Sequence, residues 1–259
     1  MRLALFYAAL FVALGVQLPF LPVWLAAKGL DADMIGIVLA IPMIVRVFAI
    51  PITTRGADRH DALRLAIVLA AAGAVVGYGA VGLAQGAVAI AVAFIFASVF
   101  YTPIMPLADA YALRGLGRLG RAYGPVRMWG SAAFIVGSFG AGLLLDVTAA
   151  VDLIWLIVAA AAITAAAACT LTPLAAHPGS AADAGLSSAS GVWRDPAFLA
   201  VAAAASLIQA SHAVYYGFSA LDWRAAGLDG TAIAALWALG VAAEIVLFAV
   251  SGRLPIAPT

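Results

Sequence analysis

The chain has 259 residues, of which 66% are hydrophobic and only 10% are charged, and its mean hydropathy is +1.12. A soluble domain usually carries about 25% charged residues and presents a polar exterior, so this composition excludes a water-soluble fold. The net charge of +1 gives no reason to expect a nucleic-acid partner, and the single cysteine excludes a disulfide framework. The sequence therefore predicts an all-α integral membrane protein whose partner is the lipid bilayer.

Eight apolar runs are long enough to cross the hydrocarbon core of a bilayer, which takes about 20 helical residues. Most of the segments between these runs carry charged or turn-forming residues, which supports their assignment as loops. The predicted spans are Leu3–Ala27, Met34–Thr53, Leu63–Leu83, Ala87–Ala112, Met128–Leu145, Leu153–Leu171, Ala197–Leu221 and Thr231–Val250.

The thirteen Lys and Arg residues are unevenly distributed over the loops. With the N-terminus in the cytoplasm, the inside segments hold Arg2, Arg55, Arg59, Arg64, Arg114, Arg118, Arg121, Arg127, Arg194 and Arg253, the outside loops hold Lys28 and Arg224, and Arg46 lies within a span. This bias follows the positive-inside rule, which applies to short loops. We therefore predict a multi-pass protein of the bacterial inner (plasma) membrane with a cytoplasmic N-terminus.

The longest inside segment follows the sixth span. Residues 173–195 are rich in Ala, Ser and Gly and lack helical periodicity, which is typical of a flexible linker. The segment divides the chain into a predicted six-helix bundle, residues 1–172, and a predicted two-helix part, residues 196–259.

An internal repeat relates these two parts. A shift of 198 positions (227 − 29 = 198) places Gly29-Leu30-Asp31 on Gly227-Leu228-Asp229 and Arg55 on Arg253. Parallel repeats of six helices are the plan of the major facilitator superfamily. Because the second copy stops after two helices, we expect a major facilitator-type bundle truncated after helix eight.

Two charged residues lie well inside predicted spans. Arg46 of the second span and Glu244 of the eighth superpose under the same shift (46 + 198 = 244). A charge at the centre of a membrane helix costs roughly 2.5–3.5 kcal/mol, so each marks a functional site by default. Glu244 suits proton binding, because desolvation favours the neutral carboxyl, whereas Arg46 and Arg127 suit binding of a carboxylate.

The segments Pro106-Leu107-Ala108-Asp109 and Tyr123 to Ser131 resemble the fourth and fifth helices of lactose permease-like transporters. Over the whole chain the resemblance is to the phenylpropionate-permease branch of the major facilitator superfamily. It implies proton symport, with Arg127 and Glu244 at the substrate and coupling site and Asp109 paired to Arg127. The seventh span departs from lactose permease, since it offers His212 where that family has acidic residues.

Three further features bear on the predicted site. Histidine is a residue type that suits proton transfer, which makes His212 a candidate, and Tyr215 is either a ligand-binding or a packing residue. The segment Ala57-Asp58-Arg59 resembles the superfamily's signature loop, although Asp61 stands where a glycine is usual. That resemblance implies a gating loop in which Asp58 and Arg59 help to hold the inside gate.

These patterns predict a monomeric secondary transporter that uses alternating access to move protons with a small organic anion, such as a phenylpropionate-like aromatic acid. A sugar or nucleoside proton symporter is the alternative within the same class. From other classes, an eight-helix membrane enzyme and a non-functional remnant stay open. No zinc-ligand spacing, P-loop or paired catalytic carboxylates occur in the sequence, so we expect no enzyme activity, no metal and no cofactor.

Overall fold

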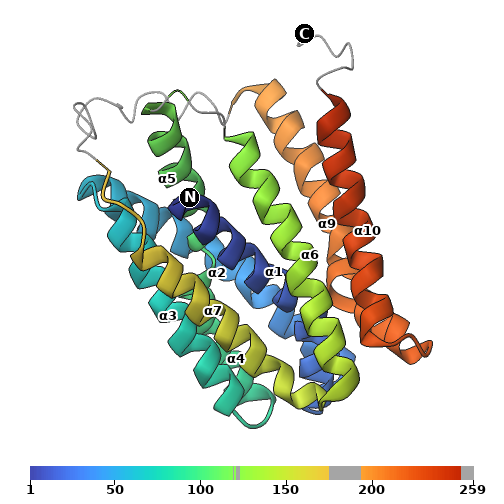
Figure 1. Ribbon diagram of the computed structural model, residues 1–259. Coiled ribbons are helices and arrows are strands. Elements are labelled where there is room, and N and C mark those ends of the chain that lie inside the picture. The colour runs from blue at the N-terminus through green and yellow to red at the C-terminus, as the bar shows by residue number, and fades with distance from the viewer. Residues whose placement is uncertain (119, 121–122, 175–193, 252–259) are drawn as a thin grey trace.

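The computed structural model describes residues 1–118, 120, 123–174 and 194–251, and within them the side chains of 124–127 and 247–251 are not described. The described residues form helices and turns without a strand (Figure 1). The helices are α1 (Arg2–Ala27), α2 (Ala32–Arg59), α3 (Leu63–Leu83), α4 (Ala87–Tyr101), α5 (Ile104–Arg118), α6 (Gly124–Val147), the short η1 (Ala150–Asp152), α7 (Leu153–Cys169), α9 (Pro196–Ala225) and α10 (Gly230–Ser251).

The helices confirm the predicted all-α membrane fold. In the described part of the chain, seven helical segments are long and apolar enough to cross a membrane, with α4 and α5 forming one segment. In α10, residues Gly230–Val246 form a shorter apolar helix. The predicted linker lies largely outside the described residues.

The largest differences from the predicted spans are in the second and the fourth. The fourth span is interrupted between α4 and α5 at Thr102 and Pro103, because proline has no backbone N–H to continue the helix. Helix α2 continues to Arg59, six residues beyond the predicted end at Thr53. Hydropathy marks the part of a helix that lies in hydrocarbon, and a helix can continue past it with polar residues.

Helix α1 lies in the centre of the bundle, and 56% of its most apolar window is buried inside the protein. It packs against α6 through two glycines, Gly15 beside the backbone of Phe134 and Gly137 beside the backbone of Val12. Neither position has room for a Cβ atom, so the two helices approach as closely as backbones can. At its far end, Trp24 of α1 donates its indole N–H to the backbone oxygen of Val151 at 3.0 Å.

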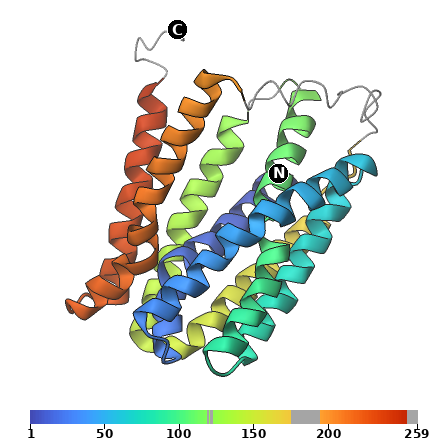
Figure 2. The same ribbon diagram turned by 180° about the vertical axis from the view of Figure 1, so that it is seen from behind.

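The α9–α10 pair lies beside this bundle and contacts it mainly at the lower end in Figure 1 (Figure 2 shows the same arrangement from behind). There Gly36 of α2 lies against Phe218, and Gly217 lies against Leu39. By contrast, none of the most apolar window of α9 is buried by the protein.

The turns after α1 and α9 have the same local structure, 198 positions apart. Their glycines, Gly29 and Gly227, have φ values of 84° and 92°, in the region that glycine adopts most readily. Asp31 and Asp229 each accept a hydrogen bond from the backbone N–H three residues further on, at 2.9 and 2.7 Å. This correspondence supports the predicted repeat, and the division into two related halves remains a prediction.

Candidate substrate and proton site

Asp109 is the most highly connected carboxylate of the predicted site. It lies on α5, and its Oδ1 accepts hydrogen bonds from the Tyr7 hydroxyl of α1 and the Tyr123 hydroxyl that precedes α6, both at 2.6 Å. Tyr7 is fully buried, whereas Asp109 is half-buried. The side chain of Arg127, its predicted partner, lies outside the described residues. The tyrosines are partners that the sequence analysis did not identify, since helix packing alone brings Tyr7 to a residue 102 positions away.

A second group of predicted residues meets between α9 and α10. We define the α9–α10 aromatic cluster as His212, Tyr215, Tyr216 and Trp237. The ring centroid of Trp237 lies 4.9 Å from that of Tyr215 and 5.5 Å from that of Tyr216. The His212 and Tyr216 centroids are 5.3 Å apart, and His212 Nδ1 lies 2.7 Å from the backbone oxygen of Ile208. These rings pack against one another between α9 and α10, and Trp237 is the ring that both tyrosines contact.

Trp237 links this cluster to the bundle and was not predicted as a site residue. Its side chain is 4% exposed, and its ring centroid lies 6.4 Å from that of Phe134 on α6. Its indole N–H has no hydrogen-bond partner among the described residues, although buried indole N–H groups usually have one. The sequence feature that could have identified Trp237 is a tryptophan in the middle of an apolar span, because lipid offers no hydrogen-bond acceptor for its indole N–H.

The two predicted intramembrane charges are placed differently. Glu244 is exposed on α10, about two helical turns after Trp237 of the aromatic cluster (244 − 237 = 7). Arg46 is half-buried on α2, and its guanidinium contacts the Met43 sulfur one turn away. No ion pair joins Arg46 to Glu244 in the part of the chain that the structure describes. The structure thus groups His212, Tyr215 and Glu244, and leaves Arg46 apart.

The predicted gating residues lie at the end of a helix, and their role in gating stays a prediction. Asp58 and Arg59 lie in the last turn of α2 and are both exposed, so they do not form a loop. The carboxylate that pairs with a neighbouring helix at this end is Asp61, which forms an ion pair with Arg114 of α5. Asp61 has a φ of 48°, which explains why a glycine would fit the same position.

The opposite end of the protein holds a contact that the sequence analysis missed. Asp146, at the end of α6, accepts hydrogen bonds from the Gly230 N–H at 2.6 Å and from the Thr231 N–H and hydroxyl at 3.1 and 2.7 Å. Asp146 therefore caps the first turn of α10 from another helix. Gly142 lies so close to the backbone of Gly230 that a Cβ at either position would clash. Capping between helices leaves no sequence pattern, since 84 positions separate Asp146 from Gly230.

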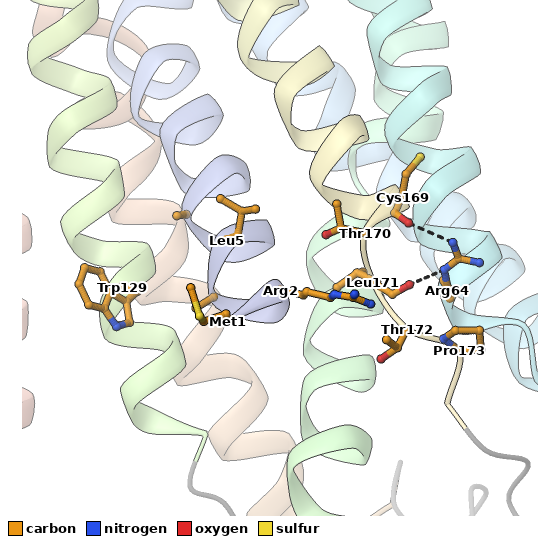
Figure 3. A pocket seen from close by; sticks show the side chains of 12 residues that line it. Met1, Arg2, Leu5, Arg64, Trp129, Cys169, Thr170, Leu171, Thr172 and Pro173 are labelled. Atoms are coloured by element: carbon orange, nitrogen blue, oxygen red, sulfur yellow. Dashed lines mark hydrogen bonds between the residues drawn. The ribbon is translucent and has the colours of Figure 1, made fainter.

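A cavity of about 1000 Å³ lies away from both groups, at the N-terminal end of α1 (Figure 3). It is lined by α1, α6 and the end of α7, and it contains none of the predicted site residues. Among the residues that the structure describes, no cluster of His, Cys, Asp or Glu side chains is arranged to hold a metal ion.

Comparisons with known proteins agree with this architecture. The sequence matches the MFS_1 like family over residues 1–255. It is 34% identical to the probable 3-phenylpropionic acid transporter of Escherichia coli (strain K12), covering 97% of this chain and 66% of that protein. It is 32% identical to the maltose permease of Geobacillus stearothermophilus, covering 65% of this chain and 43% of the permease.

The solved structure of the nucleoside transporter NupG has the same fold, with a TM-score of 0.71 at 18% sequence identity. The match covers 84% of this chain and 56% of NupG. These relatives are transporters rather than enzymes, as the sequence predicted. The chain belongs to the MFS_1 like family and is a multi-pass membrane protein with the fold of a major facilitator superfamily transporter.

Proposed function

We propose that this protein is a secondary active transporter that couples protons to the movement of a small organic anion, an aromatic acid of the phenylpropionate type. The observation that carries the proposal is the α9–α10 aromatic cluster, where packed rings and an unpartnered indole N–H lie about two helical turns from Glu244 in the described part of the chain. The 34% identity to a probable 3-phenylpropionic acid transporter supports the same substrate class.

The cluster offers complementary contacts to such a substrate. The phenyl ring stacks on Tyr215, which is 37% exposed. The carboxylate accepts a hydrogen bond from the Trp237 N–H when the cluster opens around the ligand, because Trp237 is only 4% exposed in this state. A second positive contact comes from Arg46 or Arg127, because a guanidinium binds a carboxylate through two parallel hydrogen bonds. A binding surface of this kind is mostly apolar with a few fixed polar groups, as small-molecule sites usually are.

Glu244 and His212 carry the proton in this proposal. In a site with little water a carboxyl group favours its neutral form, so Glu244 binds a proton when it faces the side of higher proton concentration. Asp109 and its two tyrosine donors form a second polar group in the bundle, and we keep Arg127, four residues after Tyr123 in the chain, as the proposed partner of Asp109.

The proposed orientation places the N-terminus in the cytoplasm, the protein in a bacterial inner membrane, and the working unit as a monomer. The Asp146–α10 contact then lies on the outer side, and we assign the structure to a state closed to the outside. Alternating access requires this contact to break when the site opens outward.

The test is uptake of radiolabelled 3-phenylpropionate into proteoliposomes with an imposed pH gradient. We expect accumulation when the outside is acidic and its loss when a protonophore dissipates the gradient. Competition by unlabelled phenylacetate, maltose and uridine then defines the substrate class. Equal uptake with and without the pH gradient would rule out proton coupling.

A sugar symporter is the second candidate, because the maltose permease matches 65% of this chain at 32% identity. In that case maltose would compete for uptake and phenylacetate would not. Trp237 is compatible with both candidates, since aromatic faces also bind sugars. The charge of the competing ligand distinguishes them, because phenylacetate is an anion and maltose is neutral.

A further inference from the structure

The cavity in Figure 3 opens on the outside of the bundle rather than between the bundle and the α9–α10 pair. It is lined by Met1 and by Arg2 and Leu5 of α1, with Trp129 of α6 on one side and residues 169–173, at and after the end of α7, on the other. We call it the α1–α6–α7 groove.

The apolar wall of this groove faces away from the protein. Leu5 is 56% exposed and Trp129 is 64% exposed, although both lie within one or two turns of a membrane-spanning helix end. In a chain that crosses a bilayer, such side chains are in contact with acyl chains. Tryptophan is also enriched where hydrocarbon meets the headgroups, so Trp129 places the groove at the level of that interface.

The polar end of the groove is positively charged. Arg64 of α3 donates its Nε–H to the Leu171 oxygen at 2.6 Å and an Nη2–H to the Cys169 oxygen at 3.0 Å. These bonds satisfy carbonyl groups at the C-terminal end of α7 and fix the guanidinium in place. Arg2 lines the same end.

No acidic residue balances this charge among the described residues that line the groove. The lining contains no Asp or Glu, and within the described part of the chain neither Arg2 nor Arg64 forms an ion pair with a carboxylate. An apolar wall that continues into an uncompensated pair of guanidinium groups matches a molecule with an acyl chain and an anionic headgroup. A free anion would contact the two guanidinium groups but would leave the apolar wall of the groove without a partner.

We propose that the α1–α6–α7 groove binds an anionic phospholipid. The headgroup phosphate lies between Arg2 and the unbonded edge of Arg64, and an acyl chain lies along Leu5 and Trp129. Basic pockets at the cytoplasmic ends of membrane helices bind anionic headgroups in this way. The inference goes beyond the proposed transport function, because it concerns none of the substrate or proton residues.

The test uses the purified full chain in detergent, equilibrated with phosphatidylglycerol or phosphatidylcholine of the same acyl composition, with retained lipid counted by native mass spectrometry. We expect preferential retention of phosphatidylglycerol. One interfacial arginine contributes about a fivefold change in affinity for an anionic lipid, so R2Q reduces this preference about fivefold and R2K retains it.

Arg59→Gln is the matched control, since Arg59 is an exposed arginine at the same end of the bundle but outside the groove. It leaves the preference unchanged, whereas W129A weakens retention of both lipids. Each variant is first checked for a monodisperse size-exclusion profile. Equal retention of the two lipids by the unmodified chain, an R59Q effect as large as that of R2Q, or displacement of the lipid by millimolar inorganic phosphate would each overturn the proposal.

Discussion

The six-helix bundle and the α9–α10 pair are held in different ways. In the bundle, α1 is surrounded by other helices, and 56% of its apolar window is buried by protein, compared with none of the corresponding window of α9. Glycine contacts run along α1 and α6, whereas the pair is joined to the bundle chiefly near the α1–α2 and α9–α10 turns.

This difference predicts that the bundle determines the stability of the fold and that the α9–α10 pair is the part that moves. Close backbone packing along a whole helix cannot slide without losing many contacts at once, so the bundle behaves as one body. A pair attached mainly at one end can change its angle to the bundle when that attachment is released. We therefore expect bundle variants to affect folding, and variants of the pair to affect ligand binding and opening.

The largest effect on stability is expected from G137A in α6. The new methyl group would meet the backbone of Val12, which cannot rotate away, and overpacking of this kind costs about 1–3 kcal/mol. The folded, monodisperse fraction after heating, measured by size exclusion, should fall. On the same helix, a methyl group added at Gly140 would have no neighbouring atom within 4 Å, so G140A should keep or raise the melting temperature. Equal effects of the two variants would contradict tight α1–α6 packing.

Trp237→Phe tests the binding surface of the pair. The substitution keeps an aromatic ring but removes the indole N–H, and a hydrogen bond to a charged group contributes about 1.5–3 kcal/mol. We expect the Kd for 3-phenylpropionate, measured by isothermal titration calorimetry, to rise roughly tenfold or more. Trp155→Phe is the control, because Trp155 lies on α7 and is 46% exposed. An unchanged Kd for W237F would exclude Trp237 as the carboxylate donor.

Asp146→Ala tests the attachment of the pair. Loss of a side chain that caps a helix costs about 1 kcal/mol, which corresponds to about fivefold faster hydrogen exchange at the Gly230 and Thr231 amides. Asp152→Ala removes a nearby carboxylate that makes none of these hydrogen bonds and should leave the exchange rates unchanged. The contact would not be an attachment point if D146A exchanged at the unmodified rate.

The smallest effect is expected at Asp61. Asp61→Gly loses an ion pair with Arg114 but relieves a positive φ, and each contribution is at most about 1 kcal/mol, so they nearly cancel. Asp61→Ala loses the ion pair without that relief and should lower the melting temperature further. If the glycine variant were as unstable as the alanine variant, the positive φ would carry no cost.

Hydropathy and loop charge were sufficient to predict the spans, because a helix in lipid needs a continuous apolar run that is visible residue by residue. The Gly-Leu-Asp turns could be predicted for the same reason, since a left-handed glycine followed by a capping aspartate is a local pattern. The contacts of Tyr7 with Asp109 and of Asp146 with α10 could not, because they depend on which faces of distant helices meet. The end of α2 at Arg59 could not be predicted for a related reason: hydropathy locates the bilayer boundary and not the end of a helix.

The most direct test of proton-coupled transport is Glu244→Gln, assayed in proteoliposomes for two activities of the same sample. Glutamine keeps the shape of the side chain but cannot bind and release a proton. We predict that accumulation of 3-phenylpropionate driven by a pH gradient is lost, while exchange of labelled for unlabelled substrate at equal concentrations continues. Accumulation at the unmodified rate in E244Q would contradict the assignment of Glu244 as the proton-coupling residue.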